Sequence, residues 1–494
     1  MRHERLIAAS DPLEVDHIPA ASRVERLLLA VVVLATLFFA FVTPPFQAPD
    51  ENQHYMKALL LSEGRVLTER KGSAIGAALP RAAIDLHDVD FPTSFGGAPQ
   101  LYDRAALVRA WNSDAARSGT RFADFPNVAN YAPTLYAPGA AGLLIGDALG
   151  LPRIGSFYMG RLVNALVALA MLAAALRLMP FGRPAMLAVA LLPTTAYQTG
   201  SLSPDAVING IGFLGLALAL RIGFAPPARG RMAAAFLVAP LLALAKGVYL
   251  PLMAAGLRLP RSRRDPRPWT LAAAMIAGAV AFVAWQAYSG GSQALYHIAS
   301  RKTGAMMMTA PLGDQLAVIL ADPIAYARVL ASSIAERAPV YALQIVGRFG
   351  WNAILLPLAA YPLAALMLGG AIACGAGMRF PLLQRLWWLA IVVGTALLIE
   401  TAMYLTATPL AADYIQGTQG RYFLPLLPLA LLALMPERGL PMARSVFAAS
   451  AILLLSVAAF TVHDSFWVHG FVTADGMPPH RSLTSALLLP SPRW

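Results

Sequence analysis

The sequence has few charged residues and almost no cysteine. Only 13% of its 494 residues are Asp, Glu, Lys or Arg, whereas a soluble domain carries about 25%. The single cysteine, Cys374, excludes a disulfide framework or a cysteine-ligated zinc site within one chain. The P-loop, the Gly-x-Ser-x-Gly nucleophile turn and the His-Glu-x-x-His zinc motif are also missing. These absences argue against the common soluble hydrolases and P-loop enzymes.

Hydrophobic residues, in contrast, make up 58% of the chain, and apolar stretches recur along it. About 20 residues of apolar helix cross the hydrocarbon core of a bilayer. We therefore predict an all-α integral membrane protein with about 11 transmembrane helices. The predicted spans lie at about 27–42, 156–179, 185–200, 206–223, 232–245, 248–258, 269–288, 354–374, 386–407, 422–436 and 442–463.

The net charge of +12 is interpreted as an orientation signal. Arg23 and Arg26 precede the first span and no small-x-small cleavage site follows it, which predicts a retained anchor with a cytoplasmic N-terminus. The apolar stretch Tyr131–Leu149 is broken by Pro133 and Pro138. If this stretch does not cross, the later arginine-rich connections all face the cytoplasm, as the positive-inside rule favours. The charge therefore calls for no nucleic-acid partner.

This topology divides the chain into a membrane domain and polar segments. Residues 1–22 are predicted to form a flexible cytoplasmic tail, and residues 23–463 a polytopic membrane domain. Within that domain, residues 44–155 form a long first outer loop with juxtamembrane helices, and residues 289–353 form a second outer segment. Residues 464–494 are predicted to be an outer C-terminal tail.

A short polar stretch, residues 44–54, follows the first span directly and reads PPFQAPDENQH. Asp50 and His54 are four residues apart and share one face of a helix, while Glu51 adds a second carboxylate. Two interpretations stay open at this point. Asp50 can be the N-cap of a helix, with Gln53 completing a capping box. Alternatively, the carboxylates can act as general bases where the membrane meets water.

Further polar side chains are predicted at the outer ends of other spans. Lys246 lies between two short spans, so it should sit within the outer half of the membrane, where an ionisable group indicates a functional site. Snorkelling to the interface is the alternative for this lysine. Cations bind phosphate, and a nearby carboxylate can act as a base. These outer residues are Arg161, Asp205, Lys246, Arg421 and Tyr422.

Other patterns are weaker. His87–Asp90 contains an Asp-x-Asp, which we interpret as solvated loop, and Glu51-x-x-His54 is a single pair, weak as a metal site. Asp322–Val346 is predicted to be an amphipathic helix interrupted by Pro339. Trp351, a little further on, either lines the site or anchors the chain at the membrane interface.

The motifs also occur in a characteristic order. They are the first anchor, Pro49-Asp50-Glu51-x-x-His54, Arg161 followed by Asn164, Ser203-Pro204-Asp205, Lys246, and Gly420-Arg421-Tyr422-Phe423-x-Pro425. Over roughly residues 27–463 the chain resembles the bacterial membrane-protein family called domain of unknown function 2142. That family is similar to the GT-C superfamily of polyprenyl-phosphate-sugar-dependent glycosyltransferases.

The resemblance implies a GT-C-like fold and roles for particular residues. It implies a catalytic base in the first outer loop, which Asp50 or Glu51 matches, with His54 beside them. It also implies an acidic residue in the next outer loop, which Asp205 matches. Cations that hold the donor phosphate are implied as well, and the candidates are Arg161, Lys246, Arg421 and the adjoining Tyr422.

The implied activity is an inverting sugar transfer on the outer face of the bacterial inner membrane. The donor is a polyprenyl-phosphate-linked sugar, the acceptor a glycan or lipid of the cell envelope, and membrane lipid surrounds both. No cofactor is called for, and a divalent metal stays an open alternative. A transporter or flippase of lipid-linked saccharides would use the same cations without a base, although the sequence symmetry typical of many transporters is not evident. A non-catalytic envelope-assembly protein is the third alternative.

Overall fold

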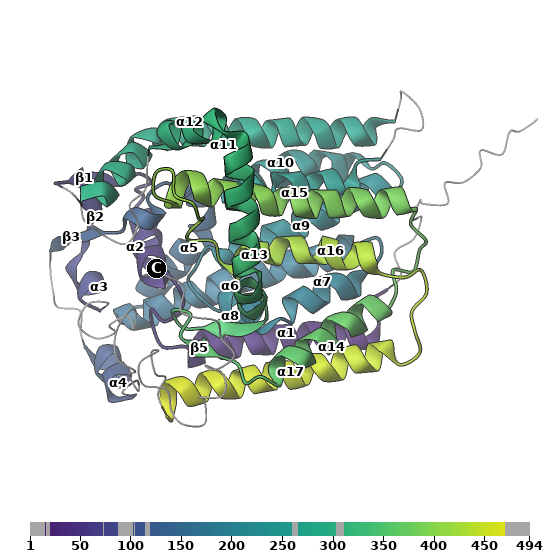
Figure 1. The fold of residues 1–494 in the computed structure, drawn as a ribbon. Coiled ribbons are helices and arrows are strands. Elements are labelled where there is room, and N and C mark those ends of the chain that lie inside the picture. Colours follow the sequence, from purple (N-terminus) through teal and green to yellow (C-terminus); the bar gives the residue numbers. More distant parts are fainter. Residues whose placement is uncertain are drawn as a thin grey trace, which may run out of the picture.

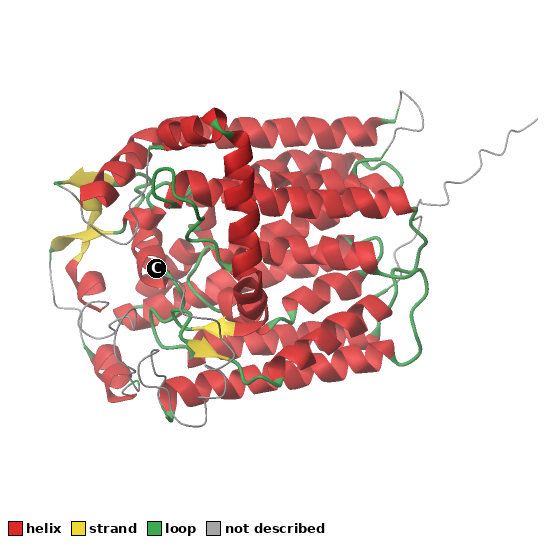
Figure 2. Ribbon diagram, viewed as in Figure 1, coloured by secondary structure: helices red, strands yellow, loops and turns green. Residues whose placement is uncertain are grey.

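The structure is a computed structural model that describes residues 15, 20–72, 74–86, 102, 104–113, 119–258, 265–302 and 311–469. Helices dominate this part of the chain and strands are few (Figure 2). Most of the long helices run along one axis of the molecule (Figure 1). A small sheet and several short helices gather at one end of that axis, on the left in Figure 1.

Six helices in the described ranges are long and apolar enough to cross a membrane, judged by length and composition. A seventh candidate is a pair of helices bent by 106° at Asp322. The six are α1 (Arg23–Val42), α6 (Arg153–Leu178), α9 (Asp205–Phe224), α11 (Pro266–Lys302), α15 (Leu382–Ala407) and α17 (Ala443–Trp467). The bent pair is α12 (Leu312–Ala321) and α13 (Pro323–Gly347).

The prediction of about 11 transmembrane helices is therefore not supported. The other apolar stretches form helices that are shorter or broken, several of them at prolines, which remove a backbone donor and disfavour helix in the preceding residue. The predicted span 185–200 is split before Pro193, and the predicted span 248–258 forms a 3-10 helix. These shorter elements are α7 (Arg183–Ala190), α8 (Pro193–Thr199), α10 (Arg229–Ala245), η4 (Gly247–Gly256), α14 (Ala360–Ala373), η5 (Gly420–Leu426) and α16 (Leu427–Leu434).

The first outer loop folds into short elements. The predicted juxtamembrane stretch Tyr131–Leu149 contains a 3-10 turn and a helix of 12 residues, too short to span a bilayer. The helices here are α2 (Glu51–Ser62), α3 (Arg81–Asp85), α4 (Arg104–Asn112), η2 (Pro126–Val128), η3 (Pro133–Leu135) and α5 (Ala137–Ala148). The Asp-x-Asp of His87–Asp90 lies outside the described residues.

Two small sheets correct the all-α prediction. The strands β1 (Glu69–Lys71), β2 (Ala74–Pro80) and β3 (Thr120–Asp124) form an antiparallel sheet in the order β1-β2-β3. Gly76 on β2 pairs with Asp124 on β3. A Cβ at Gly76 would lie 1.7 Å from the Ala123 carbonyl oxygen, so β2 and β3 can approach this closely only because residue 76 is glycine. The second sheet pairs β4 (Arg348–Phe349) with β5 (Ile354–Leu355).

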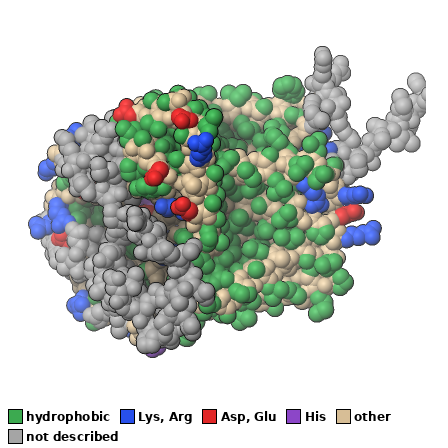
Figure 3. Space-filling model, viewed as in Figure 1, with side chains coloured by type: hydrophobic (Ala, Val, Ile, Leu, Met, Phe, Trp, Pro, Cys, Tyr) green, Lys and Arg blue, Asp and Glu red, His purple; other side chains and the backbone are tan. Residues whose placement is uncertain are grey.

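The helices differ in what surrounds them. α9 is apolar on all sides and most of it is buried, which is expected of a central helix. α1, α11 and α15 expose large side chains such as Leu34, Val280 and Leu383. In Figure 3 hydrophobic side chains cover the face of the bundle, and Lys and Arg lie towards its two ends, the end with the sheet and the end opposite it. α13 crosses the long helices instead of running along them (Figure 1).

Candidate functional site

The stretch that connects α1 to α2 has an unusual backbone. Phe46 and Asp50 both adopt positive φ values, 64° and 61°, a left-handed conformation that is a genuine outlier for a bulky residue such as Phe46. Tyr197 and Trp351 hold the connection by donating to the carbonyl oxygens of Gln47 and Phe46, at 3.0 and 3.1 Å. Strained backbone of this kind persists only where the surroundings impose it.

Asp50 is the N-cap residue of α2, but its side chain makes no capping hydrogen bond. The predicted capping box with Gln53 is therefore wrong. The left-handed conformation at Asp50 turns the chain so that its carboxylate reaches a distant partner instead: Arg421 Nη2 donates to Asp50 Oδ2 at 2.9 Å. The side chain of Asp50 keeps 29% exposure, so it is accessible.

Glu51, the next residue, has a different environment. Its side chain is completely buried and forms an ion pair with Arg161, with Nη2 to Oε2 at 2.6 Å and Nε to Oε1 at 2.8 Å. The backbone N–H groups of Phe46 and Leu202 also donate to its two oxygens, at 3.1 and 2.8 Å. The carboxylate of Glu51 thus ties the start of α2 to α6, to the loop after α1 and to the turn before α9.

Arg161 is equally saturated. Its guanidinium has five N–H groups. Two of them bind Glu51, and the other three bind the carbonyl oxygens of Ala40, Thr43 and Pro44. No donor is left for a phosphate, so the expectation that Arg161 holds the donor phosphate is not supported by this geometry. Glu51 and Arg161 together fix the loop after α1.

Arg421 is the centre of a second, less enclosed cluster. It lies on η5 and faces two carboxylates, Asp50 just before α2 and Asp205 at the start of α9, with Nε 3.1 Å from Asp205 Oδ2. Arg421 Nη1 is buried and has no hydrogen-bond partner among the residues that the structure describes. Buried guanidinium N–H groups are normally paired, so the N–H donors of Nη1 are available for a ligand.

Asp205 reaches the cluster because the turn before α9 is fixed. Ser203 Oγ accepts from the Asp205 backbone N–H at 3.2 Å. Asn164 on α6 donates to the carbonyl oxygens of Ser201 and Ser203, at 3.0 and 2.9 Å. The Asn164 that follows Arg161 in the motif order is therefore a support of the turn that carries Asp205.

Lys246 and Tyr422 complete the charged cluster. Lys246 separates α10 from η4, and its Nζ lies 3.9 Å from the centre of the Tyr422 ring, a cation–π contact. Tyr249 donates to the Tyr422 carbonyl oxygen at 2.7 Å. Lys246 interacts electrostatically with Asp205 and Asp50. Two cations and two carboxylates from four chain segments thus meet at one place.

His54 lies beside this cluster and is buried. Its Nδ1 lies 2.9 Å from Tyr136 Oη, and its ring is stacked near that of Tyr131, with the centroids 6.2 Å apart. Burial lowers the pKa of His54 to about 4, against the opposing effect of Asp50 and Asp205. The imidazole is thus neutral at pH 7 and can exchange a hydrogen bond without carrying charge.

The tyrosines Tyr131, Tyr136 and Tyr249 were not predicted as site residues. Tyr131 and Tyr136 lie in the apolar stretch Tyr131–Leu149, and Tyr249 lies three residues after Lys246. The sequence feature that could have identified these tyrosines is that each is an aromatic residue with a hydroxyl group close to a segment predicted to form the site. No spacing rule links these tyrosines to residues so far away in the chain.

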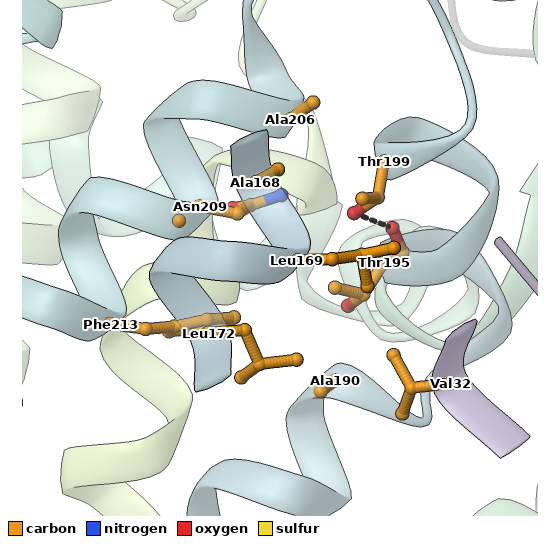
Figure 4. Close-up of a pocket in the computed structure, with 11 residues that line it drawn as sticks. Val32, Ala168, Leu169, Leu172, Ala190, Thr195, Thr199, Ala206, Asn209 and Phe213 are labelled. Carbon is orange, nitrogen blue, oxygen red and sulfur yellow. Dashed lines mark hydrogen bonds between the residues drawn. The ribbon is translucent and has the colours of Figure 1, made fainter. Parts of the chain in front are cut away.

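The cavity shown in Figure 4 lies elsewhere. It has a volume of about 10 Å³ and is lined by residues of α1, α6, α7, α8 and α9, among them Val32, Leu172, Asn209 and Phe213. This volume is room for about one water molecule. In Figure 4 the Thr199 hydroxyl bonds to the Thr195 carbonyl oxygen, at 2.7 Å, instead of serving a ligand. A sugar cannot bind there.

A metal ion finds little support in the described ranges. They contain no group of three or more His, Cys, Asp and Glu side chains that could hold one. The carboxylates of Asp50 and Asp205 are both turned to Arg421. The charged groups of the cluster are therefore arranged around a guanidinium.

Fold and site together define a multi-pass helical membrane protein with a charged cluster at one end of its helices. The family model described as "Predicted membrane protein (DUF2142)" matches residues 33–430. The chain belongs to this family. A search of the curated proteins and a search of the solved structures each found no match.

Proposed function

We propose that this protein is a glycosyltransferase that acts on the outer face of the membrane. It moves a sugar from a polyprenyl-phosphate donor to a cell-envelope glycan or lipid. The observation that carries the proposal is the cluster itself. One accessible carboxylate, Asp50, is held by strained backbone next to two cations, Arg421 and Lys246. Sugar transfer from a phosphate needs a base for the acceptor hydroxyl and cations for the departing phosphate.

In this proposal Arg421 changes partners when the donor binds. Before binding, its charge is balanced by Asp50 and Asp205. The donor phosphate takes the unused Nη1 and competes with Asp50 for Nη2, since arginine binds phosphate through paired N–H groups. Asp50 is then free to accept the proton of the acceptor hydroxyl. That hydroxyl attacks the sugar carbon, the bond from this carbon to the phosphate oxygen breaks, and Arg421 and Lys246 stabilise the phosphate.

The charge distribution supports an outer location for this site. Arg183 pairs with Glu25 at the start of α1, and Arg385 donates to the Ala433 carbonyl oxygen. These arginines lie at the opposite ends of their helices from the Asp50 cluster. The positive-inside rule then favours a cytoplasmic side for the arginines and an outer side for the cluster. The proposed membrane is the bacterial inner membrane.

The test uses purified protein in liposomes with polyprenyl-phosphate sugars and an envelope lipid acceptor, with the product followed by mass spectrometry. Asp50→Asn keeps the shape of the side chain and removes the base, so we expect transfer to fall about 100- to 10,000-fold while donor binding remains. Asp147→Asn is the matched control, because Asp147 also pairs with an arginine, Arg153, but lies outside the cluster. We expect this control to turn over at the wild-type rate.

Donor binding is measured separately. Lys246→Ala or Arg421→Ala should each weaken binding of the polyprenyl-phosphate sugar about tenfold or more, the loss of one charge-assisted contact. Equal transfer rates in wild type and Asp50→Asn would refute the proposed base. Movement of the lipid-linked sugar across the bilayer without any transferred product would establish the flippase alternative instead.

A further inference from the structure

A buried carboxylate outside the Asp50 cluster is the next unexplained feature. Glu400 lies on α15, one of the helices fit to cross the membrane, and it is 1% exposed. Ionisable side chains at such positions are rare and usually functional. Thr418 Oγ1 donates to Glu400 Oε2 at 2.8 Å. The hydroxyl of Tyr341, on α13, also interacts with the Glu400 carboxyl group.

Thr418 belongs to a short segment, residues 415–420, that is held at three points. Besides the Thr418 contact, the backbone N–H of Ile415 donates to Ser333 Oγ at 3.0 Å, and that of Gly420 donates to Gln344 Oε1 at 2.6 Å. Ser333, Tyr341 and Gln344 are spaced along one face of α13. The segment is thus clamped between α13, which crosses the long helices, and Glu400 on α15 (Figure 1).

The residue that follows this segment is Arg421. Its ion pairs with Asp50 and Asp205 join η5 to α2 and α9, so the place where the segment ends decides where the guanidinium lies. The hydrogen bond from Thr418 offsets part of the cost of burying the Glu400 carboxyl group and anchors the chain at this point.

We propose that Glu400 is a positioning residue: through Thr418, and together with Ser333 and Gln344, it holds residues 415–420 so that Arg421 faces Asp50 and Asp205. Only the consequence for phosphate binding rests on the proposed function. The anchoring of the segment stands on the contacts alone, and the two parts are tested by different measurements.

Hydrogen exchange followed by mass spectrometry tests the anchoring without any substrate. Peptides that cover residues 415–421 should exchange up to about tenfold faster in Glu400→Ala, because the hydrogen bond that anchors Thr418 is lost. Glu400→Gln keeps an acceptor for Thr418 and should restore most of the protection. Thr418→Val removes the same bond from the other side, so the test remains decisive if Glu400→Ala fails to fold.

Tyr326→Phe is the matched control. It removes another contact between α13 and α15, the 2.7 Å hydrogen bond from Tyr326 to Thr401, next to Glu400 in the chain. Exchange of residues 415–421 should not change in this variant. Unchanged exchange in both Glu400→Ala and Thr418→Val, or equal acceleration in Tyr326→Phe, would overturn the anchoring role.

Binding of farnesyl phosphate, a short polyprenyl phosphate, tests the consequence for Arg421. We expect Glu400→Ala to weaken it up to about tenfold, and the double variant with Arg421→Ala to bind no worse than Arg421→Ala alone. Independent, additive losses would show that Glu400 does not act through Arg421. If the wild type does not bind farnesyl phosphate, the proposed function fails, and the exchange result still decides the anchoring.

Discussion

At the scale of single residues, Asp50 and Glu51 show how neighbours in one motif come to differ. Both are acidic and adjacent in the sequence, yet only Asp50 is accessible, and Glu51 is buried against Arg161. The difference arises because Asp50 is the left-handed residue before α2, whereas Glu51 is the first residue of the helix and faces α6. We therefore propose Asp50 as the base and expect Glu51 to stabilise the fold.

This assignment predicts opposite consequences for the two amide substitutions. Glu51→Gln leaves the buried Arg161 without its counter-charge, so it should lower the free energy of unfolding by about 3–5 kcal/mol. Thermal unfolding of the purified protein in detergent measures the loss. Glu63→Gln, which removes a carboxylate near the surface, should change it by no more than about 0.5 kcal/mol. If Glu51→Gln is as stable as Glu63→Gln, the ion pair does not hold the fold.

The pKa of His54 predicts an acid-dependent stability. Its folded pKa of about 4 is below the unfolded value of 6.5, so the unfolded chain binds more protons between these values. The contribution of neutral His54 to the free energy of unfolding is fully present above about pH 6.5 and is lost as the pH falls towards 4. The loss is about 3 kcal/mol at most. Melting temperatures from pH 7.5 to 4.5 should fall less steeply in His54→Gln than in wild type. Equal slopes in His54→Gln and wild type would contradict the prediction.

The sequence predicted much of the residue content of the cluster, because charged groups in apolar surroundings are conspicuous. Asp50, Asp205, Lys246, Arg421 and Tyr422 meet as expected. The roles within it were not predictable from spacing. Arg161, like Arg421, is predicted at the outer end of a span, but all its N–H groups donate to backbone carbonyl oxygens or to Glu51. Donor saturation depends on the tertiary arrangement of carbonyl groups, which a one-dimensional pattern does not contain.

At the scale of elements, hydropathy located the apolar stretches but not their breaks. Hydropathy averaged over a window gives each proline no more weight than any other residue. In the structure Pro193 lies at the start of a short helix, and Pro251 and Pro425 restrict the backbone within short 3-10 helices. The breaks place the site: Lys246 lies where α10 gives way to the 3-10 helix η4, and Arg421 lies in the 3-10 helix η5, which precedes α16.

Close contact between α9 and η4 gives a prediction at this scale. A Cβ at Gly256 would lie 2.0 Å from the Ala219 carbonyl oxygen, so Gly256→Ala must push η4 away. We expect a loss of about 1–3 kcal/mol in the free energy of unfolding and weaker donor binding, since η4 begins directly after Lys246. Gly369→Ala in α14 has open space around it and should stabilise by up to about 1 kcal/mol. Equal stabilities for the two variants would show that the helices adjust without cost.

At the scale of the whole molecule, the orientation in the membrane is the main prediction. Paired reporters of cytoplasmic and external location are fused after Gly182 and Gly377, in arginine-rich turns, and after Gly72, in the turn between β1 and β2. The positive-inside rule predicts the cytoplasm for the first two and the outside for the third. A common side for Gly72 and Gly182 would mean either that Tyr131–Leu149 crosses as well as α6 or that neither crosses, and would remove the outer placement of the site.

The ion pair between Glu51 and Arg161 also constrains the order in which the protein can be assembled. Its partners are 110 positions apart, so at the moment Glu51 leaves the ribosome, its counter-charge has not been synthesised. The loop after α1 cannot settle until α6 has entered the membrane. A nascent chain that stops before Arg161 would therefore carry the Glu51 carboxylate without the counter-charge that accompanies its burial in the finished protein.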